Sequence, residues 1–121
     1  MKVLYIAGPY GDSGGYLAIE DNITVARKAA AFLARNGIGF CSPHLNFAHF
    51  EVVTPDVPVS FWRELDIRLL KGCDGIYMLR GWQASEGARE ERDAAREMGL
   101  PLFYDSGYES DRLALLAWAG R

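Results

Sequence analysis

The sequence predicts an α/β domain, with a doubly wound, flavodoxin- or Rossmann-like parallel sheet of four to five strands and helices on both faces. Short apolar runs alternate with longer helical patterns along the chain, which is the order of such folds. The first apolar run is continuous rather than alternating with polar residues, as is typical of a parallel strand covered on both faces. A length of 121 residues suits a single domain over residues 1–121.

The first strand is expected at residues 2–7, an apolar run that ends sharply at Gly8-Pro9-Tyr10. A glycine-rich loop follows at residues 11–15. Its glycines match neither the nucleotide-phosphate loop nor the dinucleotide fingerprint, so we expect a mobile lid rather than a phosphate cradle.

The next elements are a helix and a short strand. Asp21 or Asn22 is expected to cap a helix that runs to Asn36, and Gly37 suits the residue just beyond its end. Residues 38–41 form the second strand, which closes at a Ser-Pro pair.

The second half of the chain repeats this order. Residues 51–59 contain two prolines and are expected to form a loop at the rim of the site. Ser60 can cap a helix over residues 61–72, and residues 74–79 form the third strand.

A third helix, a fourth strand and a terminal helix complete the chain. Ser85 has the hydroxyl of a helix N-cap, so we expect a helix over residues 85–98. A strand at 100–104 and an apolar helix at 111–118 follow. Ligands of such folds bind beyond the carboxyl ends of the strands, so the ends of the first three strands are expected to form the site.

The composition excludes several classes of partner. The net charge is −3 and Lys and Arg are not clustered, which argues against a nucleic-acid polymer but permits a small phosphorylated ligand. No apolar run is long enough to span a membrane and no signal peptide is recognised, so we expect a cytoplasmic protein. Cys41 and Cys73 are isolated and are interpreted as reduced, buried, small hydrophobes. No cofactor is expected.

Glu91 is the most informative residue of the sequence. On a helix that begins after Ser85, it shares a stripe with Ala88, Ala95 and Met98, whereas the neighbouring charged residues, among them Glu90, take the wet faces. A carboxylate on the buried side is costly without a partner and often marks a functional site. An ion pair with a neighbouring Arg is the simpler alternative, and the pattern alone leaves both open.

Asp66 is the second acidic side chain that is expected to face inward. It lies four residues after Trp62 and three before Leu69, next to the apolar stripe of its helix. A surface ion pair with Arg63 or Lys71 is the alternative reading.

His44 and His49 have a spacing that metal sites can use. No third ligand with zinc-like spacing lies nearby, so we expect no metal there.

Several short motifs, taken in their order and spacing, resemble those of the nucleoside 2-deoxyribosyltransferase-like superfamily over residues 2 to about 104. They are Tyr5-Ile6-Ala7-Gly8-Pro9-Tyr10, Pro43-His44, Asp66 with Cys73-Asp74, Gly81-Trp82, and Ser85-x-Gly87-Ala88-x-x-Glu91. The superfamily includes deoxyribosyltransferases, 2′-deoxynucleoside 5′-phosphate N-hydrolases and many small members of unassigned activity. The resemblance is strongest to this last group.

The resemblance implies three catalytic residues. Glu91, six positions after Ser85, corresponds to the glutamate that attacks the anomeric carbon. Asp66 corresponds to the aspartate that holds or protonates the leaving base, and Tyr5 to the tyrosine that supports the nucleophile. Ser85 corresponds to the serine that helps to hold a 5′-phosphate. The residues expected to bind substrate are Gly8, Pro9, Tyr10, His44, Arg80, Gly81, Trp82, Ser85, Gly87 and Ala88.

Other features of the resemblance concern specificity and assembly. Arg80 stands where family members often have proline, and its cation is a candidate to reach a phosphate. The family often completes its site with a Ser or Asn from a neighbouring subunit, for which Ser106 and Ser110 are candidates. We expect a homodimer or a higher homo-oligomer, because the chain is small and the segment 113–118 is strongly apolar.

The expected function is hydrolysis of the base–sugar bond of a nucleoside 5′-monophosphate. An acidic residue beneath the anomeric carbon stabilises the developing positive charge, and a second acid assists departure of the base. Deoxyribosyl transfer between bases is one alternative. A nucleotide-binding or nucleotide-sensing module with little turnover is another. The identity of the base and of the sugar is left open by the residues.

Overall fold

A four-stranded, all-parallel sheet in the order β2-β1-β3-β4 forms the centre of the computed structural model, which describes residues 1–11 and 14–121. The strands are β1 (Val3–Ala7), β2 (Gly39–Cys41), β3 (Gly75–Met78) and β4 (Leu102–Tyr104). β1 lies in the middle, so Tyr5 pairs with Cys41 on one side and with Ile76 on the other. The predicted parallel α/β fold is therefore confirmed, with four strands.

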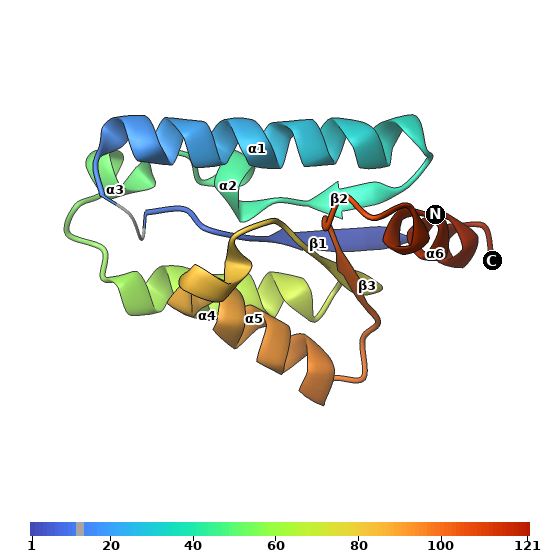
Figure 1. The fold of residues 1–121 in the computed structure, drawn as a ribbon. Helices are drawn as coiled ribbons and strands as arrows, with labels where there is room; N and C mark the ends of the chain where they lie inside the picture. The colour runs from blue at the N-terminus through green and yellow to red at the C-terminus, as the bar shows by residue number, and fades with distance from the viewer. Residues whose placement is uncertain (12–13) are drawn as a thin grey trace.

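Helices cover both faces of the sheet (Figure 1). One face carries α1 (Tyr16–Arg35) and the C-terminal α6 (Glu109–Ala119). The other carries α4 (Val59–Leu70) and α5 (Glu86–Glu97). The connections between these elements contain two short helices, α2 (Pro43–Asn46) and α3 (Phe50–Val53), and the 3₁₀ turn η1 (Trp82–Ala84).

The alternation of side chains along β1 divides the core into two clusters. Leu4 and Ile6 pack with buried residues of α1 and α6, among them Leu33 and Leu115. Tyr5 and Ala7 point to the opposite face and pack with residues of α4 and α5. Successive residues of a strand face opposite sides of the sheet, so this division follows directly from the strand. Tyr5 is thereby aimed at the face that carries Asp66 and Glu91.

The start predicted for the first long helix was wrong. α1 begins at Tyr16, five residues before Asp21, and its N-cap is Gly15. Asn22 lies inside the helix, and its side-chain amide donates to the Tyr10 backbone oxygen at 2.7 Å. Asn22, a residue type that often caps helices, thus binds the loop at Tyr10 instead. The predicted end is confirmed, because Gly37 has a φ of +72° just after the helix.

The connection from β2 to α4 is more helical than predicted. Residues 51–53, assigned to a loop, belong to α3, and Pro43 occupies the first helical turn of α2, where its fixed φ is favourable. Ser60 does not cap α4, because Pro58 is the extended N-cap residue and the helix begins at Val59. Asp12 and Ser13 of the loop predicted as a lid lie outside the described residues.

The end of the chain returns to the sheet. α6 places Leu115 in the core, with Leu116 and Trp118 packed against the same cluster, and the Trp118 ring lies 4.8 Å from the Phe103 ring of β4. Lys2 at the start of the chain lies over the Trp118 ring, at 4.6 Å from its centroid. The apolar side of the segment 113–118 is therefore used, at least in part, within the chain.

Candidate active site

Tyr5, Asp66 and Glu91 come together on the α4–α5 face of the sheet, above β1. Tyr5 is fully buried, and its hydroxyl donates a hydrogen bond to Glu91 Oε2. Glu91 shares the inner stripe of α5 with Ala88 and Ala95, which are both buried. The helical period thus predicted correctly that Glu91, and not Glu90, faces the sheet. Met98, also assigned to that stripe, is 37% exposed at the end of the helix.

Both acids of this triad hold their protons more tightly than exposed carboxyls. Burial raises the pKa of Glu91 to about 8, with a smaller contribution from the negative charge of Asp66. The hydrogen bond from Tyr5 and the cation of Arg63 oppose that rise but do not cancel it. Burial also raises the pKa of Asp66 to about 6. Tyr5 has a pKa well above its ordinary value, again through burial first and Glu91 second, and therefore remains a donor.

Asp66 has hydrogen-bonding capacity that the described residues do not use. The residue is partly buried on α4, and its Oδ1 atom is sealed from solvent without a hydrogen-bond partner in the described part of the chain. A buried acceptor without a donor is costly, so a protonated carboxyl or a ligand donor would be favourable there. Asp66 faces inward, as its place beside the apolar stripe predicted.

The ends of the strands meet where the fold class predicted. His44 Nε2 lies 2.7 Å from the Pro9 backbone oxygen, and the rings of Tyr10 and His44 have centroids 5.5 Å apart. A Cβ added at Gly81 would lie 3.6 Å from the Pro9 ring. At Gly8 it would lie 2.8 Å from Leu79 Cβ, so only glycine fits this close approach of β1 to β3. The carboxyl-terminal edge of the sheet thus brings together Gly8, Pro9, Tyr10, His44 and Gly81.

The N-terminus of α5 forms as predicted. Ser85 is buried, and its hydroxyl accepts a hydrogen bond from the Ala88 backbone N–H at 3.2 Å. A Cβ added at Gly87 would meet no atom within 4 Å, so the first turn has open space beside it. Ala88 is only 1% exposed and packs in the core, so it supports the turn rather than lining an opening.

Arg63 of α4 lies next to this helix start. Its guanidinium forms ion pairs with Glu86 at 3.5 Å and with Glu90 at 3.2 Å. Its charge also acts on Glu91, whose pKa it lowers. The sequence pattern suggested Arg63 only as a surface partner for Asp66. The structure instead gives the triad and the start of α5 a shared neighbouring cation.

Arg80 and Trp82 are directed elsewhere. Arg80 Nε donates to the Asp105 backbone oxygen at 3.2 Å, and its guanidinium overlies Gly107 beyond β4. Trp82 packs against Tyr104, and the Arg92 guanidinium lies 4.8 Å from the centre of its ring. Arg92 also donates to the Tyr104 hydroxyl at 3.1 Å and is partly buried, although its position predicted a wet face.

A polar network joins the edge of the site to α1 and α3. The Tyr10 hydroxyl donates to Glu51 at 2.9 Å and accepts from the His49 backbone N–H at 2.8 Å. His49 contacts Glu20 through Nε2, and the Tyr16 ring stacks on it with centroids 4.7 Å apart. Across the described ranges 1–11 and 14–121, no three His, Cys, Asp or Glu side chains gather closely enough to hold a metal ion.

Cys41 is a free thiol, as predicted, and it lies next to the triad. It is partly buried on β2 directly beside Tyr5, and it interacts electrostatically with Asp66. The thiols of Cys41 and Cys73 also interact, which lowers the pKa of Cys41. The two cysteines are free but not isolated from one another. The position of Cys41 at the carboxyl end of a predicted strand was the signal that could have marked it.

Comparison with known families gives an assignment that covers most of the chain. A family profile described as "Domain of unknown function (DUF4406)" matches residues 2–104. The chain belongs to the DUF4406 family. The DUF4406 match begins just before β1 and ends with β4, so it contains Tyr5, Asp66 and Glu91 and leaves α6 outside.

A pyruvate carboxylase of Schizosaccharomyces pombe (strain 972 / ATCC 24843) is 29% identical over 104 residues. The aligned part covers 78% of this chain and 9% of that protein, so the DUF4406 chain spans less than a tenth of the carboxylase. In the described part of the DUF4406 chain, no helix is long and apolar enough to cross a membrane.

Proposed function

We propose that the chain is an N-glycosidase that hydrolyses the base–sugar bond of a nucleoside 5′-monophosphate through Glu91. The observation that carries the proposal is the hydrogen bond from buried Tyr5 to Glu91, beside a second acid, the partly buried Asp66. Two acids whose environments raise their pKa values by different amounts are the parts that glycosidic cleavage uses.

The proposed reaction has two steps. Glu91 attacks the anomeric carbon as the bond to the base breaks, and the protonated Asp66 delivers its proton to the departing base. Water then attacks the same carbon, its proton returns to Asp66, and the sugar phosphate leaves with Glu91 regenerated. Positive charge develops on the sugar ring in both transition states. The attraction between this charge and the neighbouring carboxylate is therefore strongest in the transition states.

The two pKa values predict a particular pH profile. The productive form has Glu91 ionised and Asp66 protonated, although their pKa values of about 8 and about 6 favour the opposite arrangement at pH 7. The rate should therefore rise up to pH about 6, remain level, and fall above pH about 8.

The same dependence of rate on pH results if the two roles are exchanged, so that Asp66 attacks the anomeric carbon and Glu91 donates the proton. A 2′-fluoro nucleotide analogue that slows release of the sugar, followed by peptide mapping by mass spectrometry, distinguishes them. The label is expected on Glu91, and a label on Asp66 would reverse the assignment of the two residues.

Access to the triad is a requirement of the proposal. A hollow of about 640 Å³ lies along α4 and a cavity of about 310 Å³ lies on the opposite face of the sheet, and neither is lined by Tyr5, Asp66 or Glu91. Access to the triad therefore requires either an opening beside Asp66, which is only partly buried, or displacement of neighbouring side chains.

The first test is a panel of ribo- and deoxyribonucleoside monophosphates and the matching nucleosides, with free base measured by chromatography. Release of base from a monophosphate is expected, and a folded protein that releases none overturns the proposal. Adding a second base tests transfer, which would yield a new nucleoside. Thermal stabilisation by a nucleotide without turnover would favour the binding module, since a ligand stabilises by mass action whether or not bonds break.

Neighbouring glutamates provide a matched pair of variants. Glu91→Gln is expected to lower the rate by at least about 10³-fold, because loss of a nucleophile removes the main pathway. Glu90→Gln alters an exposed residue one position away that pairs with Arg63 and contributes little to the pKa of Glu91, so it should change the rate far less than Glu91→Gln. Asp66→Asn should cost about 10²–10⁴-fold, the usual range for general acid assistance. Equal effects of Glu91→Gln and Glu90→Gln would contradict the assignment.

Arg63 is the cation proposed to bind the 5′-phosphate, together with the free N–H groups at the start of α5. It pairs with Glu86 in the first turn of that helix, whereas Arg80 is held at Asp105 beyond β4. Arg63→Gln should raise KM for a monophosphate at least about tenfold, whereas its effect on the nucleoside should be much smaller and should act only through the pKa of Glu91. Arg80→Gln serves as its control and should change neither.

The homodimer also remains a prediction. Part of the apolar segment that motivated it packs on the chain's own core, while Leu113 is 55% exposed. Light scattering at micromolar concentration should give a dimeric mass, and a monomeric mass would refute it.

A further inference from the structure

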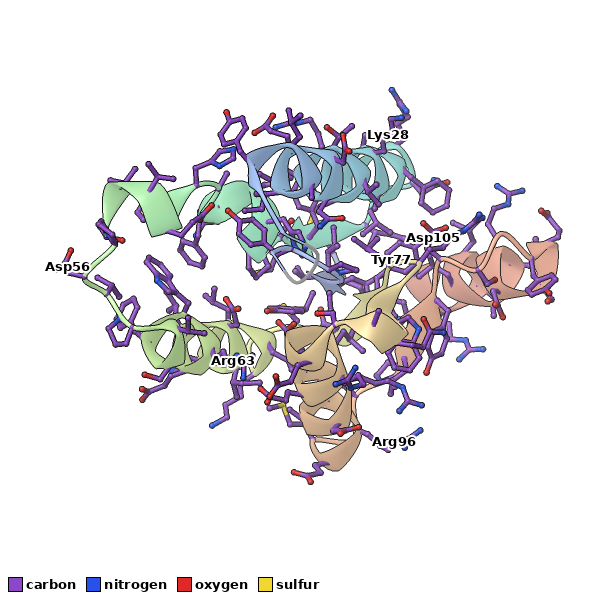
Figure 2. All side chains as sticks on the ribbon, turned by 60° about the vertical axis from the view of Figure 1, so that its left-hand side comes forward. Lys28, Asp56, Arg63, Tyr77, Arg96 and Asp105 are labelled. Atoms are coloured by element: carbon purple, nitrogen blue, oxygen red, sulfur yellow. The ribbon has the colours of Figure 1, made fainter. Side chains whose placement is uncertain are left out.

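A cavity of about 310 Å³ lies on the face of the sheet opposite the triad, between α1, the end of β4 and the start of α6. This volume is at the lower end of the range for small-molecule sites, which are mostly apolar with a few polar groups. Figure 2 shows Tyr77 and Asp105 between α1 and the C-terminal segment. The apolar and aromatic lining of the cavity comprises Val25, Ala29, Phe32, Tyr104, Tyr108 and Leu115.

Tyr77 brings an unused polar group to this cavity. The residue is only 6% exposed, and among the described residues its hydroxyl has no hydrogen-bond partner, although it is not sealed from solvent. Burial raises the pKa of Tyr77 to about 12, and the charge of Asp105 adds to that rise, so the hydroxyl keeps its proton. A buried hydroxyl that opens only to a cavity needs a partner from a ligand or from water.

Asp105 contributes an acid that forms no ion pair within the described chain, although the nearby Arg80 cation lowers the pKa of Tyr77. Its backbone is engaged, because its N–H donates to Met78 at 2.8 Å and its carbonyl accepts from Arg80. Its carboxylate has neither a hydrogen bond nor an ion pair within residues 1–11 and 14–121. This side chain lies close to Tyr77, as its effect on the pKa of that residue indicates.

The basic residues around the cavity are occupied or turned away. Arg112 forms a two-pronged interaction with Glu109, at 3.0 and 3.2 Å. Lys28 stands at the rim and extends outward from α1 (Figure 2).

Tyr104 and Ser106 also line the cavity, but their hydroxyls are engaged with Arg92 and Asp111. The Tyr77 phenol and the Asp105 carboxylate are therefore polar groups that a ligand can use.

We propose that this cavity binds a small protonated amine carried on an apolar ring, with the ammonium group at Asp105 and Tyr77. Aromatic faces attract cations, and a carboxylate in a partly desolvated position binds an ammonium through charge-assisted hydrogen bonds. The ring of the ligand would pack on Phe32, Ala29 and Leu115. The site is separated from Glu91 by the sheet, so it does not depend on the proposed glycosidase activity.

The test uses benzylamine as the probe, with benzyl alcohol and benzoate as neutral and anionic analogues of similar shape. Titration of the ¹⁵N-labelled chain is expected to shift the amides of Tyr77, Ala29 and Leu115. Benzylamine should bind at least about tenfold more tightly than benzyl alcohol, the size expected for a hydrogen bond to a charged group.

Variants separate recognition from packing. Asp105→Asn keeps the shape and should remove the preference for benzylamine over benzyl alcohol, whereas Glu97→Gln, an exposed acid on the other face, should not. Ala29→Phe should fill the cavity and abolish binding of both. The proposal is overturned if benzylamine shifts no cavity amide, if benzoate binds as well as benzylamine, or if Asp105→Asn leaves the preference unchanged.

Discussion

The two faces of the sheet use the same strand for opposite purposes. On the α1–α6 face, β1 presents Leu4 and Ile6 to a core made almost entirely of apolar side chains. On the α4–α5 face, the same strand presents Tyr5, whose hydroxyl reaches Glu91 beside Asp66. One face therefore gains stability from β1, and the other uses β1 to hold a carboxyl with a raised pKa.

This difference shows how chemistry is placed in a small domain. A parallel strand covered on both faces has side chains buried in alternating directions, so changing one position need not disturb the other face. The apolar face provides the burial, at about 25 cal/mol per Å² of apolar area. The acidic face carries carboxyl groups that are costly to bury and whose pKa values are raised, which is a common property of functional sites.

Removing a side chain from the apolar face should have the largest effect on stability. Leu4 is fully buried, so Leu4→Ala is expected to lower the free energy of unfolding by about 3 kcal/mol through lost burial and a residual cavity. Urea denaturation at pH 6 measures this change. Leu17→Ala, on the exposed side of α1, is the control and should cost less than about 0.5 kcal/mol. Similar losses for both would contradict the assignment of the core.

The acidic face should respond to pH in a way that the apolar face does not. The folded pKa of Glu91 is raised to about 8, so its contribution to stability is present below its unfolded pKa of about 4.3 and is lost as pH rises through 8. Glu91→Gln removes this loss, and the variant should gain about 3–4 kcal/mol relative to the wild type between pH 5 and pH 8.

Urea denaturation at the two pH values measures that relative gain. Glu90→Gln should follow the wild type closely, because Glu90 is exposed and makes only a minor contribution to the pKa of Glu91. A Glu91→Gln variant whose stability falls with pH as steeply as the wild type would show that Glu91 is not the group responsible.

The smallest expected effect is a shift in one pKa. The Tyr5 hydroxyl stabilises the ionised form of Glu91, so Tyr5→Phe should raise the pKa of Glu91 further, by roughly one unit or less. A ¹³C NMR titration of the Glu91 side-chain carboxyl measures it directly, with Tyr16→Phe as an exposed control. A fall in the pKa of Glu91 would mean that the hydroxyl does not donate to the carboxylate.

Local pattern was sufficient for much of the fold and for the centre of the site. The order of strands and helices, the cap at Ser85 and the inward position of Glu91 follow from features within a few residues of one another. The helical period separates Glu91 from Glu90 without any knowledge of the rest of the chain. Contacts between distant segments decided where α1 begins, because Asn22 serves the loop at Tyr10 rather than a helix start.

What the sequence by itself determined is the layered α/β architecture and the inward face of the main helices and strands, since both depend on periodicities of two and 3.6 residues. Only the tertiary structure decided which cation lies near the triad. Arg63 and Arg80 are both long and flexible, and their directions are set by partners far along the chain, Glu90 for one and Asp105 for the other. Tertiary packing likewise brought Cys41 beside Tyr5 and left Asp105 unpaired in a cavity, because strands that are adjacent in the sheet are distant in sequence.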